Sequence, residues 1–118
     1  MRKIEFYRTT SGKCPIEEHL DTLTDTQVTK ITWVLKLIKD LDIVPKKYFK
    51  KLVNSNGIWE VRIDVANNTF RLLGFMQVNN LVILTNFFQK KSKKTPLNEI
   101  SIAEMRKNEY LNRGCNNG

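Results

Sequence analysis

Hydrophobic and polar residues alternate along the middle of the chain in a way that predicts β-strands. Three apolar-rich runs of strand length occupy Ile58–Val65, Thr69–Met76 and Leu81–Phe88. Asn67-Asn68 and Asn79-Asn80 separate these runs, and asparagine favours tight turns because it tolerates a positive φ. The pattern therefore predicts two successive hairpins, which together form an antiparallel meander.

If each asparagine pair forms a two-residue turn, the register assigns every strand residue to one of two faces of the sheet. One face is then apolar and carries Trp59, Val61, Ile63, Val65, Phe70, Leu72, Gly74, Met76, Ile83, Thr85 and Phe87. The other face mixes polar residues (Glu60, Arg62, Asp64, Arg71, Asn86 and Lys90) with apolar ones (Leu73, Phe75, Val82, Leu84 and Phe88). In this register Asp64 lies opposite Arg71. A helix, a partner or both must cover part of the mixed face, because it is too apolar to lie open to water.

The residues before the meander predict a strand and two helices. Lys3–Arg8 has the pattern of a short strand, which is expected beside one edge of the meander. Pro15 suits the first position of a helix, and Thr24–Gln27 has the form of a capping box that begins a second helix. The second helix is expected to end near Leu41 or Asp42. The two helices are expected to form a hairpin over the apolar face of the sheet.

The residues after the meander predict a last helix, with Thr95 as its cap and Pro96 at its first position. Residues 113–118 are expected to form a frayed tail. Together the elements predict an α+β fold, in which an N-terminal strand and a two-helix hairpin pack on an antiparallel meander sheet and a C-terminal helix follows. Residues 1–118 are expected to form a single domain, because no repeat or linker-like stretch divides them.

A strong positive charge narrows the range of partners. The formal net charge is +8 and the pI is about 9.7, which indicates a nucleic acid, an acidic protein or an anionic surface as partner. No apolar run reaches transmembrane length and the N-terminus lacks a signal-like core, so the protein is expected in the cytoplasm. Cys14 and Cys115 are therefore expected to be free thiols. With one histidine they argue against a zinc site, and no metal or other cofactor is expected.

One lysine-rich run follows the last strand of the meander and consists of Lys90, Lys91, Lys93 and Lys94. Taken singly, Arg62 or Arg71 is better explained as a partner in an ordinary ion pair or as a residue that keeps the sheet soluble. Taken as a set with this run, they favour a site for an anion.

A second basic run, Lys46–Lys51, contains Tyr48 and Phe49 between its lysines. Two interpretations are equally well supported. The run, including Lys50 and Lys51, could bind RNA through phosphate attraction and base stacking. Alternatively it is a solvated connector whose aromatic residues anchor it to the core. A brief strand is expected just after it, at Leu52-Val53.

The residue types limit the possible chemistry. His19 is the only histidine, which excludes a two-histidine nuclease within one chain, and its place beside an apolar helical stripe favours a packing role. A glycine-rich phosphate loop, a pair of metal-binding aspartates and a Ser-His-Asp set are all missing from the sequence. A cluster of lysine and arginine can still cleave RNA without a metal, because cations stabilise the charge that gathers as the 2′-hydroxyl attacks the adjacent phosphate. A lysine whose pKa is lowered by like charges could accept or supply a proton.

From Ile4 to Tyr110 the chain resembles the HigB-like, phage-derived branch of the RelE/ParE toxin superfamily. The most specific matching segments are Ile58–Arg62, Phe70–Leu72 and Phe87–Pro96, followed by Glu99, Ile100, Ala103 and Arg106. The resemblance implies a RelE-like fold and the toxin of a type II toxin–antitoxin system. It further implies an endonuclease that cuts mRNA on translating ribosomes and is neutralised by a helix-turn-helix antitoxin.

The resemblance also implies roles for individual residues. Arg62 matches a basic position in the first meander strand, Arg71 a phosphate-contacting arginine, and Lys90 and Lys91 a basic pair after the last strand. These four are the candidate catalytic residues, and the candidate RNA-binding residues are Lys50, Lys51, Lys93 and Lys94. Lys94 belongs to a Lys-Thr-Pro signature, for which a structural role is the alternative.

One departure from the family pattern keeps several functions open. Many relatives carry a histidine just before the phenylalanine of the last strand, where this chain has Thr85-Asn86. Catalysis by lysine and arginine, weak activity and a non-catalytic toxin all remain compatible with this change. The main alternative is a ParE-like toxin that binds and inhibits a protein such as gyrase, and another is a basic nucleic-acid-binding protein without toxicity.

Overall fold

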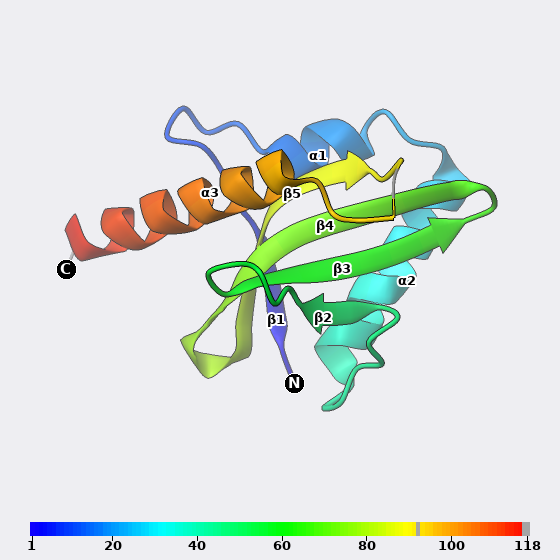
Figure 1. The fold of residues 1–118 in the computed structure, drawn as a ribbon, viewed down its shortest axis with the longest axis horizontal. Coiled ribbons are helices and arrows are strands. Elements are labelled where there is room, and N and C mark those ends of the chain that lie inside the picture. Colours follow the sequence, from blue (N-terminus) through cyan, green and yellow to red (C-terminus); the bar gives the residue numbers. More distant parts are fainter. Residues whose placement is uncertain (92, 117–118) are drawn as a thin grey trace.

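The computed structural model of the chain describes residues 1–91 and 93–116, without the side chains of Asn79 and of residues 114–116. At its centre is a five-stranded sheet with the strand order β1-β5-β4-β3-β2 (Figure 1). The strands are β1 (Lys3–Phe6), β2 (Phe49–Lys51), β3 (Ile58–Val65), β4 (Asn68–Gln77) and β5 (Leu81–Gln89). β1 runs parallel to β5 along one edge, and the remaining pairs are antiparallel. The meander and the position of the first strand are confirmed.

The hairpin between β3 and β4 turns one residue earlier than expected. Val65 pairs with Asn68, so the turn consists of Ala66, with φ 54°, and Asn67. The predicted pairing of Asp64 with Arg71 is therefore wrong, and Arg62 lies opposite Arg71. The error amounts to two residues along β4. Because side chains alternate with a period of two, the residues of β3 and β4 keep their predicted faces.

An irregularity in the pairing of β4 with β5 changes which face of the sheet some residues of the second hairpin occupy. A short 3₁₀ turn, η1 (Val78–Asn80), joins the strands, and Leu73 pairs with Asn86 whereas Gly74 already pairs with Leu84. Thr85 is thus the extra residue of a β-bulge. A Cβ atom at Gly74 would lie 2.2 Å from the Ile83 carbonyl oxygen, which explains why glycine occupies the partner strand here.

The bulge moves the first half of β5 onto the opposite faces from those predicted. Val82 and Leu84 lie in the core with Val61 and Leu72, and Ile83 lies on the mixed face with Leu73 and Phe75. Beyond the bulge the predicted faces return, with Phe87 in the first core and Phe88 in the second.

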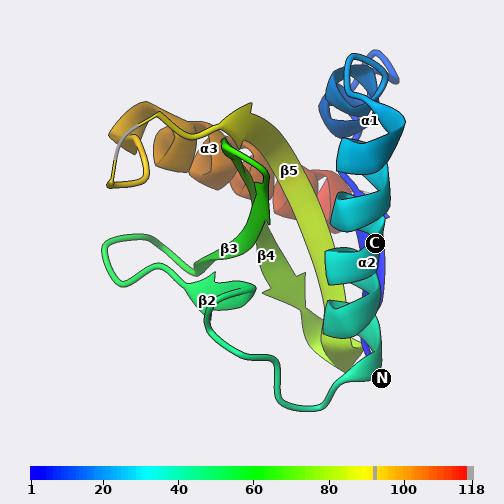
Figure 2. The same ribbon diagram turned by 90° about the vertical axis from the view of Figure 1, so that its right-hand side faces the viewer.

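The helices α1 (Pro15–Leu20) and α2 (Asp25–Asp40) cover the apolar face of the sheet (Figure 2). Thr24 and Gln27 form the predicted capping box at the start of α2, and Leu41 ends the helix where the sequence predicts. The buried side chains of the two helices are Ile16, Ile31, Val34 and Ile38. Burying such a side chain contributes about 1.5–3 kcal/mol. The predicted α+β fold is confirmed.

The helix α3 (Leu97–Asn116) covers the mixed face on the other side of the sheet (Figures 1 and 2). Ile100 and Ala103 pack on Ile58, Leu73, Phe75, Ile83 and Phe88, with Tyr7 in the same cluster. This helix supplies the cover that the sequence requires. The threonine hydroxyl just before it, at Thr95, donates a hydrogen bond to the carboxylate of Glu60.

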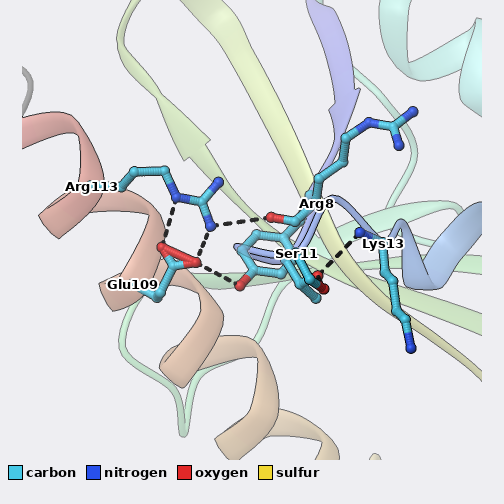
Figure 3. A network of polar contacts seen from close by, with 7 residues as sticks. Arg8, Ser11, Lys13, Glu109 and Arg113 are labelled. Carbon is cyan, nitrogen blue, oxygen red and sulfur yellow. Dashed lines mark hydrogen bonds and ion pairs between the residues drawn. The ribbon is translucent and has the colours of Figure 1, made fainter.

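The far end of α3 is fastened to the N-terminal strand by polar contacts that we term the C-terminal clamp (Tyr7, Arg8, Glu109 and Arg113; Figure 3). The Tyr7 hydroxyl and Arg113 Nε each donate to the Glu109 carboxylate at 2.9 Å, and Arg113 also donates to the Arg8 carbonyl at 3.1 Å. α3 continues to Asn116, and the rest of the expected tail, residues 117–118, lies outside the described residues. The thiol of Cys115 lies outside the described side chains, whereas Cys14 is a buried free cysteine.

The aromatic residues of the second basic run are part of the core. Phe49 is 4% exposed and stacks on Trp59 with ring centroids 4.7 Å apart, and Tyr48 contacts Trp33 edge to face. This favours the connector interpretation for both rings. The short strand here is β2 (Phe49–Lys51), so the strand expected at Leu52-Val53 begins and ends earlier.

Candidate functional site

The candidate site begins where β3 and β4 carry two arginines directly opposite each other. Arg62 and Arg71 are register partners on the mixed face, beyond the part that α3 covers with apolar side chains. Lys90 follows the end of β5, and its N–H donates to the Thr69 carbonyl at 2.7 Å, which extends the strand pairing by one residue. Three separate segments therefore bring their cations to one end of the sheet.

These cations surround a shallow depression of about 510 Å³, which we call the basic hollow. Its lining consists of Arg62, Thr69, Arg71, Lys90, Lys91 and Lys93. All four candidate catalytic residues thus meet in one place.

The guanidinium of Arg71 is buried but incompletely paired. Its side chain is 4% exposed, and it donates one hydrogen bond to the Phe70 carbonyl at 2.8 Å. Its distances to the carboxylates of Glu60 and Asp64 are 3.7 and 3.6 Å, which are long for charge-assisted hydrogen bonds. Within the part of the chain that the structure describes, the buried Nε atom of Arg71 has no hydrogen-bond partner, and the same is true of Arg62 Nε.

Glu60 is the central residue that sequence reasoning missed as part of the site. Its side chain is 2% exposed, and one carboxylate oxygen lies 3.6 Å from Arg62 Nε and 3.7 Å from Arg71 Nε. The other oxygen accepts the hydroxyl of Thr95. A single buried carboxylate therefore faces two guanidinium groups and also fastens the end of the lysine-rich loop. Its position on the mixed face beside Arg62 was the available signal.

Burial, together with the neighbouring charges, lowers the pKa values of two residues in the basic hollow. The pKa of Lys90 is lowered, first by burial and then by the positive charge of Arg71. The pKa of Arg71 is also lowered, mainly by burial, with Arg62 adding to the effect and Glu60 opposing it. Lys90 is therefore closer to losing its proton than an ordinary lysine, whereas an arginine still stays charged at neutral pH.

A second depression, the side cleft, opens next to the basic hollow. It has a volume of about 650 Å³ and lies between the β2–β3 loop and the start of α3. Its lining consists of Lys50, Leu52, Val53, Asn54, Glu60, Arg62, Lys90, Lys93, Lys94, Thr95, Pro96, Leu97 and Ile100. Arg62, Lys90 and Lys93 border both depressions, so the two are continuous.

Seven of the eight candidate basic residues line these two depressions, within the described part of the chain. The exception is Lys51, which pairs with Trp59 and shares its face of the sheet, opposite the face of Lys50 and Glu60. Sequence reasoning could not separate Lys50 from Lys51, because the strand begins earlier than expected.

Thr85 and Asn86, which depart from the pattern that the resemblance implies, bind the start of α3 and its middle. The Asn86 amide donates to the Glu99 backbone at 3.1 Å and to its carboxylate at 2.9 Å, and Arg106 donates to the Thr85 carbonyl at 2.7 Å. Asn86 lies on the predicted face but is bound to α3 rather than lining the basic hollow. His19 packs against Phe87 on the other side of the sheet, with its Nδ1 3.2 Å from the Phe87 carbonyl oxygen.

The remaining described surface has fewer features that favour chemistry. An apolar groove of about 520 Å³ lies between α2 and β1, and of its cations Lys36 is paired with Asp40 at 2.8 Å. Across the described residues, no three His, Cys, Asp or Glu side chains are grouped so that they could hold a metal ion. None of the helices, as far as they are described, is long and apolar enough to cross a membrane.

Comparison with known proteins assigns the chain to a family. The family model described as "Phage derived protein Gp49-like (DUF891)" matches residues 18–108, a stretch that runs from α1 into α3 and contains every residue of the basic hollow. No curated protein matches the chain. Since the family model covers most of the sequence, the protein belongs to the Gp49-like family of phage-derived proteins, which is a RelE-like toxin family.

Proposed function

We propose that this protein is a HigB-like toxin of a type II toxin–antitoxin system and that it cleaves mRNA on translating ribosomes. Membership of a RelE-like toxin family supports the toxin role. The net charge of +8 and the basic hollow support RNA as the target. A helix-turn-helix antitoxin would be the partner that neutralises the protein in the cytoplasm.

The observation that carries the proposal is a pair of buried arginine Nε–H groups whose hydrogen bonds are not satisfied. Arg62 Nε and Arg71 Nε are buried, have no hydrogen-bond partner among the described residues and belong to side chains that line one hollow. Buried N–H groups without a partner cost about 1–3 kcal/mol each, so they are retained where a ligand uses them. A phosphate group offers the acceptor oxygens and negative charge that two guanidinium groups bind best.

In the proposed reaction the scissile phosphate lies in the basic hollow. The ribose 2′-oxygen attacks phosphorus, the bond from phosphorus to the 5′-oxygen breaks, and the products are a 2′,3′-cyclic phosphate and a 5′-hydroxyl. Arg62 and Arg71 stabilise the negative charge that gathers on the phosphate oxygens. Lys90, whose pKa burial lowers, takes the proton of the 2′-hydroxyl, and Lys91 supplies a proton to the departing 5′-oxygen.

Expression of the wild type and of Arg71→Ala in a bacterial host tests this proposal. The wild type should arrest translation and leave transcripts with 5′-hydroxyl ends. Arg71→Ala should lower cleavage by about 10²–10³-fold, the usual effect of removing one preorganised donor. Arg8→Ala is the matched control, because Arg8 is exposed and paired with Glu17 at 3.4 Å, and it should remain toxic.

Three outcomes would contradict the proposal. If Arg71→Ala is fully toxic and unfolds at the same temperature as the wild type, the basic hollow is not needed for toxicity. Growth arrest with intact transcripts and DNA damage signalling would indicate a ParE-like protein target. Harmless expression of the folded wild type would indicate an accessory nucleic-acid-binding protein. Because Arg71 is buried, Arg62→Ala serves as a second variant at a more exposed position.

A further inference from the structure

The side cleft has two chemically different walls. Its basic wall carries Lys50, Arg62, Lys90, Lys93 and Lys94, and its apolar wall carries Leu52, Val53, Pro96, Leu97 and Ile100. Phosphate binding explains the first wall alone. A ligand that fills the cleft must therefore combine negative charge with an apolar surface.

Two side chains of the apolar wall are unusually exposed. Val53 is 93% exposed on the β2–β3 loop, and Leu97 is 75% exposed in the first turn of α3. Single exposed apolar residues are common and need no explanation. These two come from separate elements, line one cleft and border a cluster of cations, and that combination indicates a binding surface.

Contacts with α3 hold the two parts of the apolar wall in a fixed relation. The Asn56 N–H donates to the Glu104 carboxylate at 2.7 Å, and Lys107 Nζ donates to the Asn56 carbonyl at 2.8 Å. Gly57 has a φ of +76°, a backbone conformation that glycine adopts without strain, and this lets the loop turn toward α3. The loop that carries Val53 is thus tied to the helix that carries Leu97. A cleft formed in advance binds with a smaller entropic cost.

We propose that the side cleft is a nucleobase subsite, which takes the base next to the scissile phosphate and sets the base preference of cleavage. This inference rests on the proposed endonuclease function. The basic hollow and the side cleft share Arg62, Lys90 and Lys93, so a phosphate in the hollow brings the attached nucleoside to the cleft. Its volume of about 650 Å³ lies within the usual range of small-ligand sites.

Val53 and Leu97 contact the flat faces of the base in this arrangement, where its apolar rings replace water. Asn54 lies on the lining of the same cleft and carries both a hydrogen-bond donor and an acceptor. The edge of a nucleobase offers the complementary groups. Asn54 is thus the residue that distinguishes one base from another, and the two apolar residues provide affinity for any base.

The double variant Val53→Ser, Leu97→Ser tests the subsite. Both positions are exposed, so the variant should fold, and Leu97→Ser alone is a second variant. Val78→Ser is the matched control, because Val78 is 79% exposed in η1 and lines neither depression. Sequencing of 5′-hydroxyl RNA ends from expressing cells gives the bases on each side of every cut. The wild type and Val78→Ser should share one base preference, which the double variant should weaken about tenfold while cleavage continues.

The outcomes separate this inference from the proposed function. Cleavage without any base preference in the wild type would overturn the subsite and leave the endonuclease proposal standing. An unchanged preference in both serine variants would overturn it too, and would indicate that the apolar wall contacts a protein. Intact transcripts in cells that express the folded wild type would overturn the endonuclease proposal and the subsite together.

Discussion

Two arginine-rich regions of this molecule differ in how far the fold satisfies their hydrogen bonds. In the C-terminal clamp, Arg113 donates from Nε to Glu109 at 2.9 Å and from its terminal nitrogen to the Arg8 carbonyl at 3.1 Å (Figure 3). In the basic hollow, Arg62 Nε and Arg71 Nε are buried and find no hydrogen-bond partner in residues 1–91 and 93–116. Their shared carboxylate, on Glu60, stays at 3.6 and 3.7 Å.

The difference separates arginines that support the fold from arginines that serve a ligand. The clamp uses a local i,i+4 pair and a backbone carbonyl to fix α3 on the N-terminal strand. The basic hollow lowers the stability of the fold, because two like-charged guanidinium groups are partly removed from water and their hydrogen bonds are incompletely satisfied. Function is expected where the fold carries such a cost. Substitutions of the arginines themselves should therefore change mainly stability in the clamp and mainly activity in the basic hollow.

The largest expected change in stability comes from Glu60→Gln. This variant removes the buried counter-charge of Arg62 and Arg71 while keeping the shape of the side chain. Loss of one partner from a buried ion pair should lower the free energy of unfolding by about 3 kcal/mol. Chemical denaturation measures it, and added phosphate should restore part of the loss by binding the folded state. The exposed control Glu17→Gln should change stability by less than about 1 kcal/mol. Equal effects of the two variants would argue against a shared counter-charge.

A smaller change is expected from Arg113→Met in the C-terminal clamp. The pair with Glu109 is partly exposed, with side-chain exposures of 35% and 32%, so its loss should cost about 1 kcal/mol. Translation arrest by this variant should match the wild type. A stable but inactive Arg113→Met would show that the clamp belongs to the functional site and would remove the contrast.

The smallest change is expected from Lys90→Met, and it should have the opposite sign. The pKa of Lys90 in the folded protein is lowered from 10.5, mainly by burial, so the charged form destabilises the fold at neutral pH. Lys90→Met should therefore be more stable by up to about 0.5 kcal/mol at pH 7. Between the lowered pKa and 10.5, the unfolded wild type binds more protons than the folded wild type, so wild-type stability rises with pH. The difference in the free energy of unfolding between Lys90→Met and the wild type should therefore shrink. A stability difference that grows with rising pH would contradict a lowered pKa of Lys90.

The face assignments illustrate how much a strand pattern can establish. The sequence predicts the β3–β4 turn one residue too late, but the resulting shift of two residues still leaves Arg62 and Arg71 on one face. Thr85 adds a bulge residue opposite Gly74, which reverses the first half of β5. In this sequence the only sign of the bulge is Gly74, and a glycine within a strand does not by itself identify a bulge.

The sequence predicts the basic residues of the candidate site but does not predict its buried carboxylate. The sequence shows Lys90, Lys91 and Lys93 as one run, and strand alternation predicts that the two arginines share a face; all five line the basic hollow. The strand pattern predicts Glu60 only as one more polar residue of the mixed face. Its burial depends on α3 and on the hydroxyl of Thr95, which are contacts between distant parts of the chain. Local patterns do not encode such contacts, so the pairing of Glu60 with two arginines could not be predicted.

The most direct test of the basic hollow is an NMR titration of the arginine Nε–H signals with a short 2′-O-methyl RNA, which binds but cannot be cleaved. Single Arg→Lys variants assign the signals. The Nε–H signals of Arg62 and Arg71 should shift and become protected from exchange as phosphate oxygens accept them, whereas the Arg113 signal, already bonded to Glu109, should stay unchanged. Shifts confined to Arg113, or RNA binding that leaves Arg62 and Arg71 unaffected, would contradict the phosphate site.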